Sequence, residues 1–279
     1  MKYINLSAAV QERFPGFYTY APRFVLRFLE WIISQKKLNS ILTNNEGITG
    51  TRFHDNVIQE LKLKIRIEGL ENLPDHSKCF FAANHPFGII DGMILTKTVG
   101  DKYGDFKSIG NDAFMLIPNL RPHIAIVNVY GHSSKENITE LQKVYDSDIA
   151  ITHFPAGEVS RWYKNNFKSQ DREWQKSFIS KAISSKRDIV PFYFYGRNSL
   201  FFHWVNIIRR IFFIKTNLEL ILLPREFFNK KGRTIHVKIG KPISWQQFDS
   251  SLTHAEWAQR VRSYVYSLKD SDINTSFFK

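Results

Sequence analysis

The chain has 279 residues, of which 43% are hydrophobic, so it can bury the core of one large domain or two small ones. Its formal net charge of +13 suits an anionic membrane surface, nucleic acid or an acidic protein partner. Because Cys79 is the single cysteine, the sequence excludes an intrachain disulfide and a cysteine-based zinc site, and it favours a reducing compartment. No apolar run is long enough to span a bilayer, and no signal peptide is expected.

Residues 1–60 predict an N-terminal helical segment. After a turn at residues 14–17, a helix is expected from Pro22, with proline in its first turn. Polar residues recur along it at three- and four-residue spacing and leave an apolar face opposite; they are Arg23, Arg27, Glu30, Ser34 and Lys37. Such a helix can either pack on the rest of the protein or lie in a membrane interface. A loop at 44–50 and a short helix at 53–60 complete the segment.

Residues 61–279 predict one domain in which strands alternate with helices. Apolar or alternating runs indicate strands at 61–67, 79–82, 106–109, 124–129, 149–154, 189–195 (interrupted near Pro191), 219–223 and 235–239. Longer stretches with helical spacing indicate helices at 93–99, from 111, and at 135–145, 173–185, 200–214 and 253–268. The expected fold class is therefore a single α/β domain with a mostly parallel central sheet flanked by helices, preceded by the amphipathic N-terminal segment.

Residues 83–92 place a histidine and an aspartate across a turn, between a buried strand and the start of a helix. Asp91 can hold the imidazole of His85 in one tautomer and leave its second ring nitrogen free to take a proton from a hydroxyl. Gly88 lies between them and allows a positive φ or a close approach to a substrate. The alternative is structural, because aspartate is a favoured N-cap and can stand there without a catalytic role.

A second polar loop follows the strand expected at 149–154 and carries Gly157, Glu158 and Arg161. Loops that follow parallel strands gather at one edge of a sheet, where ligands bind. We therefore expect this loop and the loop that carries His85 to share a pocket. The alternative for Glu158 and Arg161 is a surface ion pair, which contributes about 0–1 kcal/mol.

Four blocks of sequence stand in a fixed order: Asn84-His85 with the later Asp91, residues 107–114, the Phe-Pro-Ala-Gly of residues 154–157, and residues 189–191. In this order they resemble the glycerolipid acyltransferases related to lysophosphatidic acid acyltransferase, over residues 60–245. Two features depart from the common pattern of that family: five residues rather than four separate the histidine from the aspartate, and Ala156 replaces a glutamate. Both departures resemble the branch that contains ornithine- and glycine-lipid O-acyltransferases and proteins named as hemolysins.

The resemblance implies an O-acyltransferase of membrane lipid synthesis. Such an enzyme moves a fatty acyl group from a thioester of acyl carrier protein or coenzyme A to the hydroxyl of a lysophospholipid or lyso-aminolipid. His85 is implied as the general base and Asp91 as the group that orients it. The residues implied to bind substrate are Asn84, Gly88, Gly157, Glu158 and Arg161. Backbone N–H groups near Gly157 are candidate oxyanion donors, and the chemistry requires no cofactor and no metal.

Residues 200–214 carry the strongest membrane signal of the sequence. On a helical wheel, polar and apolar residues gather on opposite arcs, the polar ones being His203, Asn206, Arg209 and Arg210. The stretch is too short to span a bilayer but can lie in its interface, and a buried core helix is the alternative. We expect a peripheral, monotopic protein on the cytoplasmic face of the membrane, with membrane lipids and an acidic acyl carrier protein as partners. The sequence leaves the oligomeric state open.

Three other interpretations compete with acyl transfer. Charge alone suggests a nucleic-acid-binding protein, but the sequence has no helix-turn-helix, RNA-binding or zinc signature, so no nucleic acid partner is expected. A non-catalytic membrane-perturbing protein, as the hemolysin name suggests, would keep its activity without His85, whereas acyl transfer would be lost. The longer spacing between His85 and Asp91 also leaves room for an inactive member. The remaining histidines show no metal-ligand spacing, and His153 is the one expected nearest the site.

Overall fold

A seven-stranded sheet organises the chain in the computed structural model, which describes residues 3–127, 135–163, 168–214 and 216–277. Its order is β1-β9-β8-β2-β5-β3-β4. The strands are β1 (Lys64–Glu68), β2 (Cys79–Ala83), β3 (Phe106–Gly110), β4 (Ile124–Ile126), β5 (Ala150–His153), β8 (Asp188–Phe194) and β9 (Thr234–Ile239). All neighbouring strands pair in parallel except β8 and β9, which confirms the mostly parallel sheet. A separate antiparallel pair joins β6 (Arg161–Trp162) to β7 (Ser169–Gln170).

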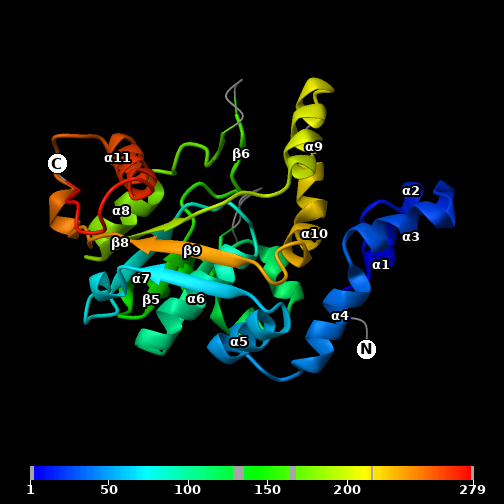
Figure 1. Ribbon diagram of the computed structural model, residues 1–279, viewed down its shortest axis with the longest axis horizontal. Coiled ribbons are helices and arrows are strands. Elements are labelled where there is room, and N and C mark those ends of the chain that lie inside the picture. Colours follow the sequence, from blue (N-terminus) through cyan, green and yellow to red (C-terminus); the bar gives the residue numbers. More distant parts are fainter. Residues whose placement is uncertain (1–2, 128–134, 164–167, 215, 278–279) are drawn as a thin grey trace.

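Helices cover both faces of this sheet (Figure 1). One face packs against α5 (Gly50–Glu60) and α6 (Ile90–Tyr103), and the other against α7 (Lys135–Asp146), α8 (Ser177–Ser184) and α11 (His254–Ser267). Successive side chains of β2 alternate between the two cores, so Phe81 faces one and Phe80 the other. Burial on both faces explains why β2 has a continuous apolar sequence rather than an alternating one.

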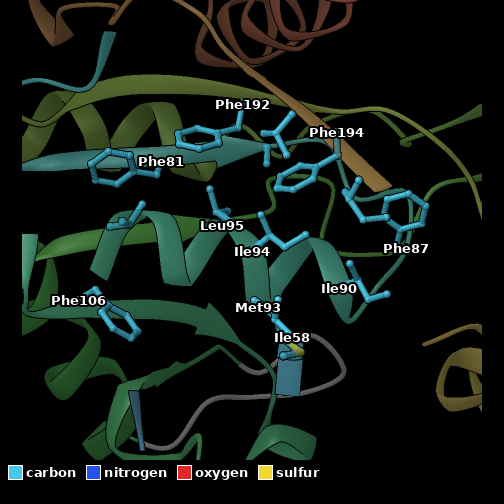
Figure 2. Packing of buried hydrophobic residues seen from close by; sticks show 14 of the residues in the cluster. Ile58, Phe81, Phe87, Ile90, Met93, Ile94, Leu95, Phe106, Phe192 and Phe194 are labelled. Carbon is cyan, nitrogen blue, oxygen red and sulfur yellow. The ribbon is translucent and has the colours of Figure 1, made fainter. Parts of the chain in front are cut away.

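The core between α6 and the sheet fixes the start of α6 (Figure 2). Asp91 belongs to this first turn. Ile90, Ile94 and Leu95 of α6 are at most 1% exposed. They pack in one cluster with Phe81 of β2 and with Phe192 of β8. Burying side chains of this size contributes about 1.5–3 kcal/mol each, so the first turn of α6 is held firmly against the ends of β2 and β8.

Before α5, the N-terminal segment forms four helices: α1 (Leu6–Arg13), α2 (Pro15–Tyr20), α3 (Arg23–Ile32) and α4 (Gln35–Asn44). Most of the turn expected at 14–17 is therefore helical, and the polar stripe expected along one helix from Pro22 is divided between α3 and α4. Ser34 adopts φ +52°, a left-handed conformation that separates α3 from α4. These helices extend from the sheet at the end of the molecule where α9 (Leu200–Ile211) and α10 (Leu223–Phe228) also stand (Figure 1). Ile32, the last residue of α3, packs against a small cluster formed by Val159, Phe202 of α9 and Leu222. The division into a segment 1–60 and a domain 61–279 stays a prediction.

The prediction of a strand at residues 219–223 is wrong. Residues Leu218–Leu222 form a 3-10 helix, which continues into α10 with Pro224 in its first turn. A short apolar run does not distinguish a strand from a buried helical turn. The acidic Glu219 within it is fully buried against arginine side chains of the candidate site, and this tertiary contact decides the conformation.

Smaller differences concern the ends and continuity of elements. β8 runs through Pro191 without interruption, because antiparallel pairing with β9 starts only at Phe192 and the Pro191 carbonyl still accepts from the Gly240 N–H at 3.0 Å. The helix expected from residue 111 is a 3-10 turn, and β4 ends at Ile126, with residues 128–129 of that expected strand outside the described residues. The short 3-10 helices are Leu70–Asn72, Asp112–Leu116, Arg121–His123, Leu218–Leu222 and Trp245–Gln247.

Candidate active site

His85 and Asp91 meet at the junction between β2 and α6. His85 Nδ1 lies 3.1 Å from Asp91 Oδ2, so the insertion of a fifth residue between them does not separate the pair. Asp91 is fully buried, whereas the His85 side chain keeps 13% of its surface exposed. Because a carboxylate only accepts hydrogen bonds, the contact assigns the proton to Nδ1 and leaves Nε2 as the basic nitrogen.

Backbone donors hold the Asp91 carboxylate in place. Its Oδ2 atom also accepts from the N–H groups of Phe87 at 2.8 Å and Gly88 at 3.3 Å, and Oδ1 accepts from Gly92 N–H at 3.0 Å. These three backbone hydrogen bonds fix the orientation of the buried carboxylate. Asp91 is the second residue of α6 and not its N-cap, so the alternative of a capping aspartate is wrong. Its carboxylate instead joins the loop before α6 to the His85 imidazole.

Gly88 supplies the sharp turn that aims these donors. Its φ is +92°, and a Cβ atom there would lie 2.9 Å from Leu223 Cδ2 and 3.0 Å from Val159 Cγ2. Both the backbone conformation and the crowding therefore favour glycine at this position.

A cavity of about 1590 Å³ opens beside His85. The lining includes His85, Gly88, Gly157, Glu158 and Arg161, so the two loops share a pocket as expected. Phe154 stacks on the His85 imidazole with ring centroids 3.9 Å apart, which restrains the ring at the cavity wall. Apolar side chains from β3, α7 and α8 extend the lining; among them are Phe106, Ile109, Leu141 and Phe178.

Asn84, which was predicted to bind substrate, is 3% exposed and is not among the residues that line the cavity. Its side-chain amide donates to the Phe194 carbonyl at 3.0 Å and accepts from the Phe194 N–H at 2.7 Å. The amide therefore ties the end of β2 to the end of β8. Its role toward substrate stays a prediction.

Glu158 and Arg161 are not an exposed ion pair. The Arg161 side chain is 2% exposed and contacts both Glu158 and Glu219, the latter at 2.7 Å from Nε to Oε1. Burial disfavours the charge of Arg161, but the two carboxylates outweigh this cost and raise its pKa. Arg161 was predicted to meet a substrate anion, but its positive charge is already balanced by carboxylates of the protein itself.

Glu219 and Arg209 were not predicted as site residues. Glu219 is fully buried, with Oε2 2.9 Å from Nε of Arg209, so it joins the start of the 3-10 helix at Leu218–Leu222 to α9. Arg172 extends the same network from the other side, with Nε 3.1 Å from Glu158. A lone acidic residue within an apolar run was the available sequence signal for Glu219, because a buried carboxylate requires a partner.

The Gly157 N–H donates to the Phe154 carbonyl at 2.9 Å, so this group is engaged in a turn rather than presented as an oxyanion donor. Gly157 adopts φ +68°, and a Cβ atom there would meet nothing within 4 Å. The turn leaves the residue open to the cavity, which is consistent with a close approach of substrate.

Among the other histidines, His153 also lines the cavity, as expected from its position before Gly157. Burial lowers the pKa of His153 to about 4, so its imidazole is neutral at physiological pH. Burial likewise lowers the pKa of His54, another lining residue, to about 4. In the described part of the chain, no group of three or more His, Cys, Asp or Glu side chains could hold a metal ion.

Helix α9 turns most of its polar arc inward, and Arg210 at the edge of this arc is exposed. His203 and Asn206 are fully buried, Arg209 is 12% exposed, and Asn206 and Arg209 line the cavity. The opposite, apolar arc is about half exposed or more; its members are Phe201, Trp204, Ile208 and Ile211. The alternative of a buried core helix is therefore wrong. No described helix is long and apolar enough to cross a membrane.

The chain is similar to several known proteins. A family model described as acyltransferase matches residues 8–274. A lyso-glycine lipid O-acyltransferase from Phocaeicola vulgatus is 38% identical over 252 residues, which cover 90% of each chain. The same-named protein from Bacteroides thetaiotaomicron is 36% identical over 266 residues, covering 95% of this chain and 97% of its own. The crystal structure of the 1-acyl-sn-glycerophosphate acyltransferase PlsC from Thermotoga maritima aligns with 97% of this chain and 95% of its own, at 16% identity and a TM-score of 0.49.

Proposed function

The chain belongs to the acyltransferase family, and we propose that it transfers a fatty acyl group from an acyl thioester to the free hydroxyl of a lyso-lipid. The observation that carries this proposal is the contact between His85 and the buried Asp91 at the wall of a large cavity. An imidazole held in one tautomer beside a space that can admit a lipid is suited to general base catalysis on a hydroxyl.

In the proposed reaction, His85 Nε2 takes the proton from the acceptor hydroxyl as its oxygen attacks the thioester carbonyl. Asp91 stabilises the imidazolium that forms, and its backbone donors keep it in place. The tetrahedral intermediate then collapses to the ester, and the departing thiol receives the proton from His85. General base catalysis of this kind contributes about 10²–10⁴-fold in rate.

We propose a lyso-lipid with an anionic head group, such as a lyso-aminolipid that carries a carboxylate, as the acceptor. The two relatives named above act, by their names, on lyso-glycine lipids. Arg172 and Arg210 line the cavity with exposed side chains, and of these Arg172 also contacts Glu158, whereas Arg161 and Arg209 are paired with the fully buried Glu219. Exposed guanidinium groups are suited to bind a carboxylate or a phosphate.

Membrane docking through exposed apolar side chains completes the proposal. α9 presents Phe201, Ile208 and Ile211 outward, and α3, whose last residue packs against the same cluster as Phe202, presents Phe24 and Trp31, each 71% exposed. Because polar residues of α9 also line the cavity, a lipid bound at the outer surface of α9 would lie next to the candidate site. The net charge of +13 would add attraction to an anionic leaflet, and we propose that the protein is peripheral and lies on the cytoplasmic face of the membrane. We propose acyl carrier protein or coenzyme A as the carrier of the donated acyl group.

The proposal is tested by incubating the purified protein with acyl carrier protein and coenzyme A thioesters and a panel of lysophosphatidic acid, lyso-glycine lipid and lyso-ornithine lipid. Thiol release and the mass of the lipid product are followed together. We expect a diacylated product from a carboxylate-bearing acceptor, at a higher kcat/KM than from lysophosphatidic acid. Thiol release without a lipid product, or vesicle leakage with no acyl transfer on any acceptor, would contradict the proposal and favour the membrane-perturbing alternative.

A further inference from the structure

Asp171 is a buried carboxylate that the proposed chemistry does not use. It lies between β7 and α8 and is 2% exposed. Its Oδ1 atom accepts from the His85 backbone N–H at 3.1 Å and from the Ser160 hydroxyl, and its Oδ2 atom accepts from Trp174 Nε1 at 3.0 Å. Burial raises the pKa of this carboxyl group, whereas the three donors oppose that rise.

The peptide of His85 is held from both sides by the same region of the chain. While Asp171 accepts from the His85 N–H, the His85 carbonyl accepts from the Ser160 N–H at 2.8 Å. Ser160 and Asp171 are in turn bonded to each other through the serine hydroxyl. The His85 loop and the loop that carries Glu158 and Arg161 are therefore joined at the backbone atoms of the histidine itself.

The backbone of Asp171 is itself held by side chains of α11. Its N–H donates to the Tyr266 hydroxyl at 2.7 Å, and its carbonyl accepts from Arg262 at 2.7 Å. α11 packs firmly against the sheet through fully buried side chains such as Val261 and Val265. A rigid path of contacts thus runs from a core helix through Asp171 to the backbone of His85.

From this geometry we propose that Asp171 is a positioning residue, which sets the place of the His85 imidazole relative to Asp91 and the cavity by fixing the His85 backbone. The inference rests on the proposed role of His85 as general base. A displacement of about 1 Å in a reacting group can cost about 10²-fold in rate, and a charged acceptor on a buried N–H holds its donor more firmly than a neutral one.

The test compares Asp171→Asn with Trp174→Phe. Asparagine removes the negative charge, and its single acceptor oxygen can face either Trp174 or the pair of His85 and Ser160. In both orientations the hydrogen bond that holds the His85 N–H is weakened or lost, because a neutral acceptor binds more weakly than a charged one. Trp174→Phe removes a hydrogen bond from the other oxygen of the same carboxylate, keeps most of the buried ring, and leaves the His85 contact intact. Trp174 is not among the cavity-lining residues.

For Asp171→Asn we expect kcat to fall about 10–10²-fold while KM for both substrates stays near the wild-type value. For Trp174→Phe we expect a comparable fall in the melting temperature with kcat retained. Equal losses of kcat in the two variants, or a wild-type kcat in Asp171→Asn, would overturn the proposal. Should Asp171→Asn fail to fold, Ser160→Ala serves instead. A fall in kcat at unchanged KM, smaller than the fall expected for Asp171→Asn, supports the positioning role of Asp171, and an unchanged kcat contradicts it.

Hydrogen exchange separates this inference from the proposed function. The His85 amide should exchange faster in Asp171→Asn than in Trp174→Phe, as resolved by fragmentation of the labelled peptide. This outcome does not depend on turnover, so a wild-type protein that is inactive on every acceptor would refute the proposed function alone. Unchanged exchange at His85 in Asp171→Asn would refute only the proposal that Asp171 positions His85.

Discussion

Asp91 serves two neighbours at once. Its Oδ2 atom accepts from the N–H groups of Phe87 and Gly88 in the loop before α6, and the same atom contacts His85 Nδ1. The residue thus has a structural role in holding this loop, together with the contact that the catalytic interpretation requires. The loop contacts give the carboxylate a fixed position, and a fixed carboxylate is what a general base requires of its partner.

At this residue scale, the turn through Gly88 tests how tightly the pair is built. Gly88→Ala should destabilise the protein more than Gly157→Ala, although both residues have positive φ. The left-handed backbone costs about 1–2 kcal/mol in either variant. The new methyl group at residue 88 would also collide with Leu223 and Val159, which adds ~1–3 kcal/mol, whereas at residue 157 it would meet nothing. Urea unfolding of both variants measures the difference, and equal losses of stability would contradict the account.

At the scale of elements, α9 has an unusual orientation for a surface helix. Its polar side packs inward against the charged network, and its apolar side faces outward. The sequence divides the helix correctly into two arcs, but it does not indicate which arc faces the protein, because that depends on buried Glu219 from a segment after the helix. Amphipathicity alone thus predicts the faces of an element and not their environment.

If the outer arc of α9 meets lipid, a charge placed there should weaken membrane binding. We expect Ile211→Asp to reduce binding to mixed phosphatidylcholine and phosphatidylglycerol vesicles, because a carboxylate in the interface loses hydration and is repelled by anionic lipid. Ile138→Asp on α7 is the matched control, since Ile138 is also an exposed isoleucine, at 56% against 64% for Ile211. Cosedimentation with vesicles gives both affinities. Equal binding of the two variants would show that α9 is not the docking surface.

At the scale of the whole molecule, buried histidines predict a loss of stability in mild acid. His203 is fully buried and stacks on Trp162. Burial, then Arg197, Arg161 and Lys230, lower its pKa to about 4 from an unperturbed value of 6.5. The unfolded chain therefore binds more protons than the native one between these values, and the free energy of unfolding falls as pH drops through this window.

His203→Phe should flatten that dependence by up to about 3 kcal/mol between pH 7 and pH 4, because phenylalanine takes up no proton in either state. The measurement is the free energy of unfolding in urea for the two proteins at a series of pH values. Parallel curves for the wild type and the variant would show that His203 does not contribute to the acid lability.

The sequence predicts most of the fold and the centre of the site, for identifiable physical reasons. Strands such as β2 are recognised because apolar runs that end in polar loops mark buried parallel strands, and His85 and Asp91 are close in sequence. Glu219 and Asp171 are recognised only in the structure. Glu219 contacts a strand residue far earlier in the chain, and Asp171 acts on the backbone of His85, which leaves no trace in residue type.

The central claim is that His85 takes the proton from the lipid hydroxyl. The most direct measurement compares acyl transfer by the wild type and by His85→Ala on the best acceptor, with vesicle binding and melting temperature recorded for both. We predict a fall in kcat of about 10²–10⁴-fold with binding and folding retained. Acyl transfer that continues at the wild-type rate in His85→Ala would contradict the account.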